Sequence, residues 1–137
     1  MEFQIKILKN PDVKNLHEIL SLYIEESWWE DAPLTDKVLE IVKGSHIFAA
    51  CFAGDEIVAM GRAISDGTSD AYIQDVTVKK EYRGKKIGAL LVKRIIDELK
   101  KDNIFWIGLI SEKNTNKFYE KLGFYEMKNT FPMKYKI

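Results

Sequence analysis

The stretch DVTVKKEYRGKKIGALLVKRII (residues 75–96) joins three local patterns and decides the fold. It opens with Val76, Thr77 and Val78, a β-branched run typical of a strand. A basic turn that contains glycine follows, and apolar residues then recur at the spacing of one helix face. A strand, a short turn and an amphipathic helix in this order predict a helix that packs against a sheet.

The turn at residues 83–88 (RGKKIG) is suited to binding a phosphate group. A helix N-terminus exposes unpaired backbone N–H groups and carries a partial positive charge. Glycine lets the backbone approach an anion closely, and Arg or Lys side chains add charge. The turn therefore favours a diphosphate site, although it matches neither the P-loop nor the dinucleotide-binding glycine pattern. On this stretch alone, a solvated basic loop is an equal alternative.

Hydrophobic periodicity predicts the remaining elements. The expected strands are residues 3–7, 46–53, 56–64, 71–79, 104–110 and 131–137. Two expected helices follow the start signals Asn10-Pro11-Asp12 and Pro33-Leu34-Thr35-Asp36, and Thr35 is the expected cap of the second. Two further helices are expected at about residues 86–101 and 114–124. The continuous apolar run 104–110 predicts a central strand buried on both faces. No linker or repeat interrupts this order, so we expect one α/β or α+β mixed-sheet domain over residues 1–137.

Composition narrows the class of protein. The chain carries 21 basic and 21 acidic residues, so its bulk charge argues against a nucleic-acid-binding protein. A single cysteine, Cys51, and two histidines argue against a disulfide and against a structural metal site. The N-terminus lacks an apolar signal-peptide core, and the longest apolar run, Ile47 to Ala53, is far short of the ~20 residues that span a bilayer. The sequence therefore predicts a soluble cytoplasmic protein with no membrane partner.

Two motifs resemble signatures of the GNAT superfamily of acetyl-CoA-dependent N-acetyltransferases. Arg83 and Gly88, together with the preceding VTVKKEY, match the signature Gln/Arg-x-x-Gly-x-Gly/Ala that follows the fourth strand of that family. Lys86 stands where the family usually has glycine. The segment KFYEKLGF (117–124) is similar to the second signature, Phe-Tyr-x-Lys-x-Gly-Phe. The two motifs lie in the family's order and at about its spacing, with a buried-strand pattern between them.

The resemblance implies a GNAT-like fold, a twisted mixed sheet of six or seven strands with flanking helices. It implies that acetyl-CoA, as co-substrate, gives its acetyl group to a primary amine that attacks directly in a ternary complex. In that family the thioester lies in a V-shaped gap between the fourth and fifth strands. The strand backbone would hold the pantetheine arm, and the amides of residues 84–89 would hold the pyrophosphate. The implied acetyl-CoA-binding residues are Val76, Thr77, Val78, Arg83, Gly84, Lys85, Lys86, Ile87, Gly88 and Ala89.

The resemblance also implies catalytic residues. Tyr119 occupies the position of the family's frequent general acid toward the CoA sulfur, and a phenol with a pKa of ~10 is able to donate a proton at neutral pH. A packing role is the alternative for this tyrosine. Asp75 is the candidate general base or the anchor of a cationic substrate, and strand alternation puts it on the same face as Ile73 and Thr77. A structural aspartate is an equal alternative, and many enzymes of the family use a water relay.

The segment YIEESWWEDAP (23–33) is the expected acceptor region. Glu25 and Glu26 supply carboxylates, while Trp28 and Trp29 supply aromatic surface. An alkylammonium needs both, through charge pairing and cation–π contact. A hydrophobic lid or a dimer contact is the competing interpretation. A small-molecule amine is favoured over a protein amine, the resemblance is compatible with a homodimer, and a non-catalytic acyl-CoA sensor would share the fold.

Overall fold

The structure is a computed structural model that describes residues 2–30 and 35–137. Its centre is a five-stranded sheet with the order β1-β2-β3-β4-β5. Neighbouring strands pair antiparallel, except that β4 pairs parallel with β5. The elements are β1 (Phe3–Ile7), α1 (Val13–Glu25), α2 (Thr35–Gly44), β2 (Ile47–Ala53), β3 (Glu56–Ser65), β4 (Asp70–Val78), the 3-10 turn η1 (Lys80–Tyr82), α3 (Ile87–Lys101), β5 (Trp106–Leu109) and α4 (Asn116–Glu120).

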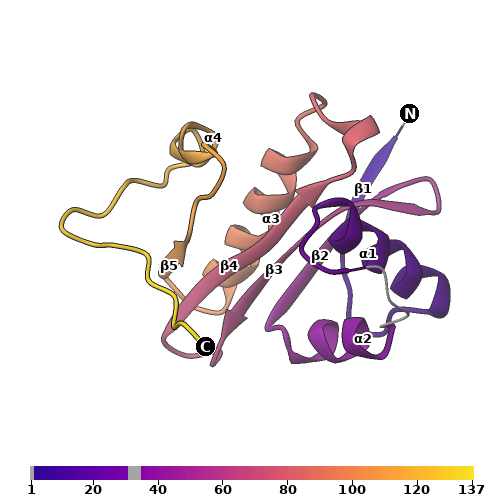
Figure 1. Cartoon of the computed structure of the whole chain (residues 1–137), viewed down its shortest axis with the longest axis horizontal. Helices are drawn as coiled ribbons and strands as arrows, with labels where there is room; N and C mark the ends of the chain where they lie inside the picture. Colours follow the sequence, from indigo (N-terminus) through magenta and orange to yellow (C-terminus); the bar gives the residue numbers. More distant parts are fainter. Residues whose placement is uncertain (1, 31–34) are drawn as a thin grey trace.

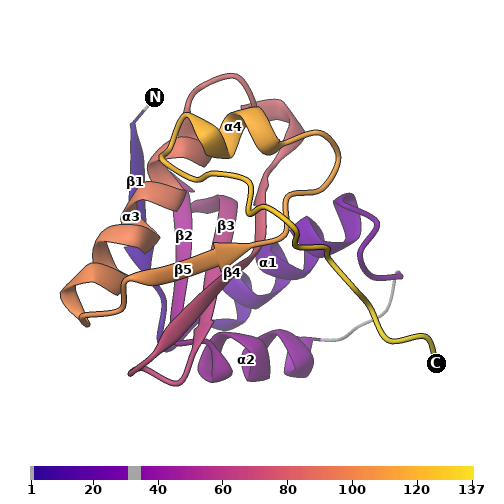
Figure 2. The same ribbon diagram turned by 90° about the vertical axis from the view of Figure 1, so that its left-hand side faces the viewer.

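Helices cover the two faces of the sheet unequally (Figure 1, Figure 2). α3 packs on one face and buries an apolar cluster that includes Leu91. α1 and α2 pack on the other face, where a second cluster includes Ile19 and Phe48. Tyr72 on β4 and Trp106 on β5 remain about half exposed, so this end of the sheet is open beside the helices. Among the described helices, none combines the length and apolar character that a bilayer crossing requires.

Local signals set the ends of several elements. Asp12 caps α1, because its carboxylate accepts from the Asn15 N–H at 2.8 Å while Asn15 Oδ1 accepts from the Asp12 N–H at 3.1 Å. Gly54, with a φ of +60°, forms the tight turn between β2 and β3. Pro33 and Leu34 of the second start signal lie outside the described residues. Thr35, expected as a cap, is already the first residue of α2.

The expected count of six or seven strands is wrong, because the described residues form five, and residues 131–137 form none. The segment 125–137 runs past β5 and away from the body of the molecule (Figure 2). Within the described part of the chain, no hydrogen bond ties this segment to the sheet. Its alternating apolar side chains at positions 131, 133, 135 and 137 are at least 80% exposed. Alternation produces a strand only where a partner backbone and a buried face are available, and Pro132 also lacks an N–H group for a ladder.

The apolar run 104–110 does not form a central strand that is buried on both faces. Only Trp106–Leu109 is a strand, and it lies at the edge of the sheet beside β4. Phe105 and Ile110, which flank it, are 69% and 63% exposed. A continuous apolar run cannot distinguish a central strand from an edge strand, because pairing on the second side is not encoded locally.

A bulge at Asp75 changes which side chains of β4 share a face. The register with β3 shifts here, and Asp75 has a φ of +56°. Ile73 and Val76 therefore both pack toward α3, whereas Asp75 bonds to Tyr23 of α1 and Thr77 bonds to Glu26, directly after α1, on the other face. The expectation that Thr77 lies on the same face as Asp75 is confirmed. The expectation for Ile73 is wrong, because the bulge interrupts the alternation.

Candidate active site

A cavity of about 420 Å³ lies beside the parallel pair β4 and β5. The end of α1, the loop after β5 and the helix α4 complete its wall. Four predicted catalytic or acceptor residues line it, namely Glu26, Trp28, Asp75 and Tyr119. Val76, predicted to contact the pantetheine arm, lines it as well. The fold thus brings together side chains that are up to 93 positions apart in the chain (26 to 119).

Tyr119 places a protonated phenol at this cavity. Its ring packs edge-on against Phe118 and Phe124, with centroid distances of 4.9 and 5.7 Å. Burial raises the pKa of the Tyr119 hydroxyl above its ordinary value. The hydroxyl therefore keeps its proton at neutral pH and is able to donate it, as a general acid must.

Asp75 is held by two neighbours on the α1 face. Its Oδ2 atom accepts from the Tyr23 hydroxyl at 2.8 Å and from Arg62 Nε at 2.6 Å. Burial, and next the charge of Asp75, raises the pKa of Tyr23, so Tyr23 stays a proton donor. Both hydrogen bonds end on the same carboxylate oxygen and hold the side chain in place. This geometry favours a positioning role for Asp75 over that of a general base.

Glu26 connects the end of α1 to the strand and the turn. Its Oε1 atom accepts from Thr77 Oγ1 at 2.8 Å and from Arg83 Nη2 at 2.6 Å. Its Oε2 atom lies 3.6 Å from Lys113 Nζ, which belongs to the loop after β5. The Glu26 side chain is only 14% exposed, so this carboxylate is a fixed negative charge in the cavity wall.

Of the other predicted acceptor residues, one lines the cavity, and two make contacts outside its lining. Trp28 is 37% exposed and lines the cavity. Trp29 instead stacks on Tyr23 with a centroid distance of 4.1 Å, and Lys37 Nζ lies 4.5 Å from its ring centroid. Glu25 Oε1 accepts from the Lys80 N–H at 2.8 Å and so fixes η1. Residues 31–33 of the expected acceptor region lie outside the described residues.

The turn before α3 presents a run of backbone amides suited to an anion. The N-cap of α3, Lys86, has no capping side-chain hydrogen bond, and the Leu90 N–H donates to the Lys86 carbonyl at 3.2 Å. Among the described residues, no oxygen accepts from the N–H groups of residues 84–89. Gly84 and Lys86 have left-handed φ angles of +80° and +64°, a pattern that gathers amides around an anion. These residues therefore fit a pyrophosphate.

Arg83 and Lys85 in this turn differ in their contacts, because Arg83 is hydrogen-bonded to the protein and Lys85 is exposed. Arg83 Nε donates to the Val78 carbonyl at 2.9 Å, while its Nη2 donates to Glu26. The guanidinium thus links the turn to the cavity wall. The Val78 carbonyl, part of the backbone predicted to hold the pantetheine arm, already accepts this hydrogen bond from Arg83. Lys85 is exposed beside the amides, where its charge is available to an anion.

Lys86 occupies the left-handed backbone region, which costs a residue such as lysine about 1–2 kcal/mol relative to glycine. We expect Lys86→Gly to raise the free energy of unfolding by about 0.5–1 kcal/mol, because relief of this strain outweighs the greater freedom of glycine in the unfolded chain. Urea denaturation measures the change. Lys85→Gly is the matched control and should not stabilise, since Lys85 has no positive φ. Equal gains at both positions would contradict the strain argument.

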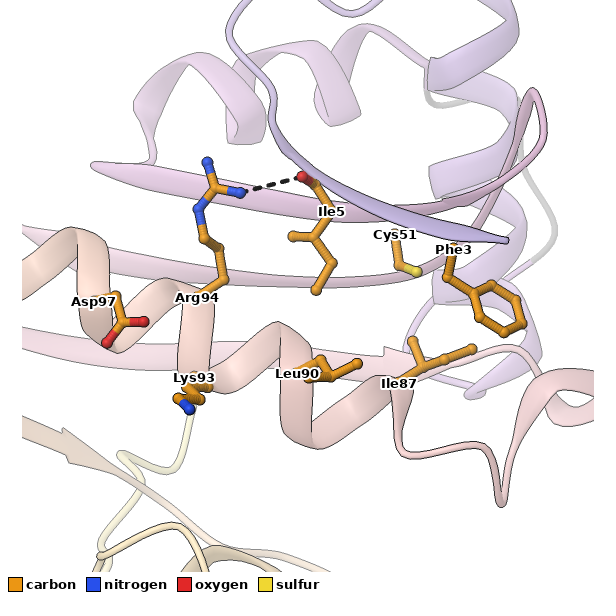
Figure 3. A pocket seen from close by; sticks show the side chains of 8 residues that line it. All are labelled: Phe3, Ile5, Cys51, Ile87, Leu90, Lys93, Arg94 and Asp97. Carbon is orange, nitrogen blue, oxygen red and sulfur yellow. Dashed lines mark hydrogen bonds between the residues drawn. The ribbon is translucent and has the colours of Figure 1, made fainter. Parts of the chain in front are cut away.

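A second cavity, of about 300 Å³, lies between β1 and α3 (Figure 3). Phe3, Ile5 and Leu90 give it an apolar lining, and Arg94 donates to the Ile5 carbonyl at 3.2 Å. Cys51 also lines it but is 1% exposed, and burial raises the pKa of its thiol. Cys51 is thus a buried residue of β2, within the expected strand 46–53. None of the predicted catalytic or acceptor residues lines this cavity, so the cavity beside β4 and β5 is the candidate site.

Two residues of the site were not predicted from the sequence. Arg62 holds Asp75, and Lys113 faces Glu26. A signal for Arg62 was present in the sequence, because a charge inside an apolar strand requires a buried partner. No such signal marked Lys113, since its partner lies 87 positions away along the chain. Tyr23 belongs to the expected acceptor segment, but its bond to Asp75, 52 positions away, was not predicted.

Comparison with known proteins agrees with this arrangement. The profile of the acetyltransferase (GNAT) family matches residues 8–124. The uncharacterized N-acetyltransferase ycf52 of Pyropia yezoensis is 30% identical over 128 residues, which cover 90% of this chain and 72% of that protein. A GNAT-family acetyltransferase of Streptococcus pneumoniae has a similar structure, with a TM-score of 0.82 and 22% identity over 99% of this chain and 98% of that chain. An aminoglycoside 6'-N-acetyltransferase complexed with coenzyme A gives a TM-score of 0.73 at 19% identity, over 88% of this chain and 83% of that chain.

These comparisons confirm the family inferred from the two motifs and the mixed-sheet fold class. The structural similarities, at 19–22% identity, show the fold alone. The family profile covers most of the chain, and the matched relative is named as an N-acetyltransferase. The chain therefore belongs to the acetyltransferase (GNAT) family and is an N-acetyltransferase.

Proposed function

We propose that this enzyme transfers the acetyl group of acetyl-CoA to the primary amine of a small molecule, by direct attack in a ternary complex. The observation that carries the proposal is the single cavity that joins Tyr119, Asp75 and Glu26, close to the turn in which no described residue accepts from the N–H groups of residues 84–89. A volume of about 420 Å³ is in the usual range of a small-molecule site. A single domain over residues 1–137 and a cytoplasmic location stay predictions.

Each part of the site has a distinct task in this reaction. Bound acetyl-CoA supplies the activated thioester. The amides of residues 84–89 bind the pyrophosphate, and the backbone of Val76 and Val78 orients the pantetheine arm. Tyr119 donates its proton to the departing thiolate. Trp28 forms an aromatic wall against which the acceptor lies.

The acceptor amine must lose its proton before it attacks. Asp75 already bonds to Arg62 and Tyr23, so we assign it to fixing the polar wall, and we assign removal of the proton to water. The rate should consequently rise with pH as the acceptor amine becomes neutral. Because burial raises the pKa of Tyr119, the acid should remain protonated at least up to about pH 10, the ordinary value for a phenol.

Release of free thiol from acetyl-CoA tests the proposal, with a panel of small amines and peptides as acceptors. We expect one or more small amines to accelerate thiol release, and the buried Cys51 should add no background signal. Calorimetric titration with acetyl-CoA should run beside the assay. Binding of acetyl-CoA without acceleration by any amine would favour the sensor alternative. Absence of binding would show that residues 84–89 do not hold the pyrophosphate.

A homodimer stays a prediction, and the exposed segment 125–137 favours it. The apolar side chains of this segment alternate, and none of the strands in residues 2–30 and 35–137 pairs with the outer edge of β5, where a second copy could add a strand. We expect light scattering to report a dimer that Met133→Asp/Tyr135→Asp disrupts. The control Lys134→Asp/Lys136→Asp changes the other face of the same segment and should stay dimeric. A monomeric wild-type protein would contradict the prediction.

A further inference from the structure

The two carboxylate oxygens of Glu26 have different surroundings. Oε1 is saturated by two short hydrogen bonds, from Thr77 at 2.8 Å and Arg83 at 2.6 Å. Oε2 has one charged neighbour, Lys113 Nζ, at 3.6 Å. The first pair of contacts fixes the carboxylate, and the second oxygen is the one directed to the loop that lines the cavity.

Lys113 is a loosely held partner of Glu26. Its side chain is 67% exposed, and 3.6 Å is longer than an ordinary hydrogen bond between an ammonium and a carboxylate. A largely exposed ion pair of this kind is weak and exchanges readily. Lys113 nevertheless shows that a primary alkylammonium fits beside Oε2, within the lining of the acceptor cavity.

We propose that Glu26 Oε2 binds an ammonium group of the acceptor and that Lys113 is an internal competitor for this position. The inference rests on the proposed function and deepens it by naming an acceptor class. The amine that attacks must be neutral, whereas the group that pairs with Glu26 must be charged. The acceptor is therefore an aliphatic diamine, with one amino group on Glu26 and the other at the thioester.

The aromatic wall agrees with this class of acceptor. Trp28 and Tyr72 line the same cavity and are 37% and 48% exposed. Such rings can cover the methylene chain of a diamine and attract its cationic end.

The test compares 1,4-diaminobutane with n-butylamine as acceptors. We expect Lys113→Met to lower the KM of the diamine about two- to five-fold with little change in kcat, because an exposed competing ion pair is lost. Glu26→Gln keeps an oxygen for Thr77 and Arg83 and should raise the KM of the diamine about ten-fold or more. Neither variant should change the KM of n-butylamine by comparable factors. Lys117→Met, on the exposed side of α4, is the matched control and should behave as wild type.

A double variant and a direct measurement of diamine binding provide two further tests of the inference. In the Glu26→Gln background, Lys113→Met should have no further effect on the diamine, because the competitor and the acceptor share one partner. Calorimetric titration with 1,4-diaminobutane should show tighter binding to Lys113→Met and weaker binding to Glu26→Gln, even without turnover. Equal effects on both amines, or unchanged diamine binding in both variants, would overturn the inference. If both amines are acetylated equally well by every variant, the transferase function stands and only the ammonium position is wrong.

Discussion

Gly88→Trp should abolish the binding of acetyl-CoA, with a loss of affinity of at least 100-fold, the size expected when a bound group is sterically excluded (about 2.7 kcal/mol or more). A Cβ atom at residue 88 would lie 3.4 Å from the Phe118 ring and 3.6 Å from Val78 Cγ2. Gly88 thus stands where the start of α3 meets both β4 and α4. The indole of Trp at residue 88 must either displace Phe118 or fill the space beside the β4 backbone and the amides of residues 84–89. This is the space in which acetyl-CoA is proposed to bind. Calorimetric titration with acetyl-CoA measures the loss.

Two variants separate steric exclusion from general damage. Gly88→Ala makes only ordinary van der Waals contacts and should keep affinity within a few-fold of wild type. Leu90→Trp places the same indole two residues further along α3, where Leu90 is 54% exposed, and should also bind. Thermal unfolding confirms that each variant is folded. Wild-type affinity in Gly88→Trp, or equal losses in Leu90→Trp, would refute the proposed path of the pantetheine arm and pyrophosphate.

The parts of the site that were predictable from sequence are local in the chain. The strand, turn and α3 lie within residues 75–96, and their order alone predicts free amides at a helix start. The motif 117–124 likewise carries Tyr119 on a short helix. Its contacts with Phe118 and Phe124 involve near neighbours in sequence, whereas its burial also depends on the core cluster formed by the sheet and α3.

The parts that were not predictable depend on register and on long-range partners. The bulge at Asp75 inserts one residue into β4, so simple alternation assigns Ile73 to the wrong face. The partners of Asp75 come from α1 and β3, and no periodicity reports such a meeting. The strand predictions for segments 104–110 and 131–137 were wrong for a related reason. An apolar pattern shows that a segment can be buried, but the presence of a partner strand is a property of the whole fold.

Tyr119→Phe should lower kcat about 100- to 1,000-fold and leave the affinity for acetyl-CoA unchanged, because loss of a positioned acid typically costs 10²–10⁴-fold. The substitution removes only the hydroxyl, so the edge-on contacts with Phe118 and Phe124 are retained. Thiol release at saturating amine gives kcat, and calorimetry gives the affinity for acetyl-CoA.

The pH profile and a second tyrosine show whether the lost hydroxyl acts as an acid. Burial raises the pKa of Tyr119, so in the wild type its deprotonation should cause no decline in kcat below about pH 10, the ordinary value for a phenol. The rate should instead rise with pH until the acceptor amine is neutral, and Tyr119→Phe should lie below this curve at every pH. Tyr72→Phe removes another hydroxyl from the same cavity and should keep kcat within a few-fold. If Tyr119→Phe retains the wild-type kcat, or if both variants lose activity equally, the thiolate takes its proton from water and Tyr119 serves only to pack α4 against the sheet.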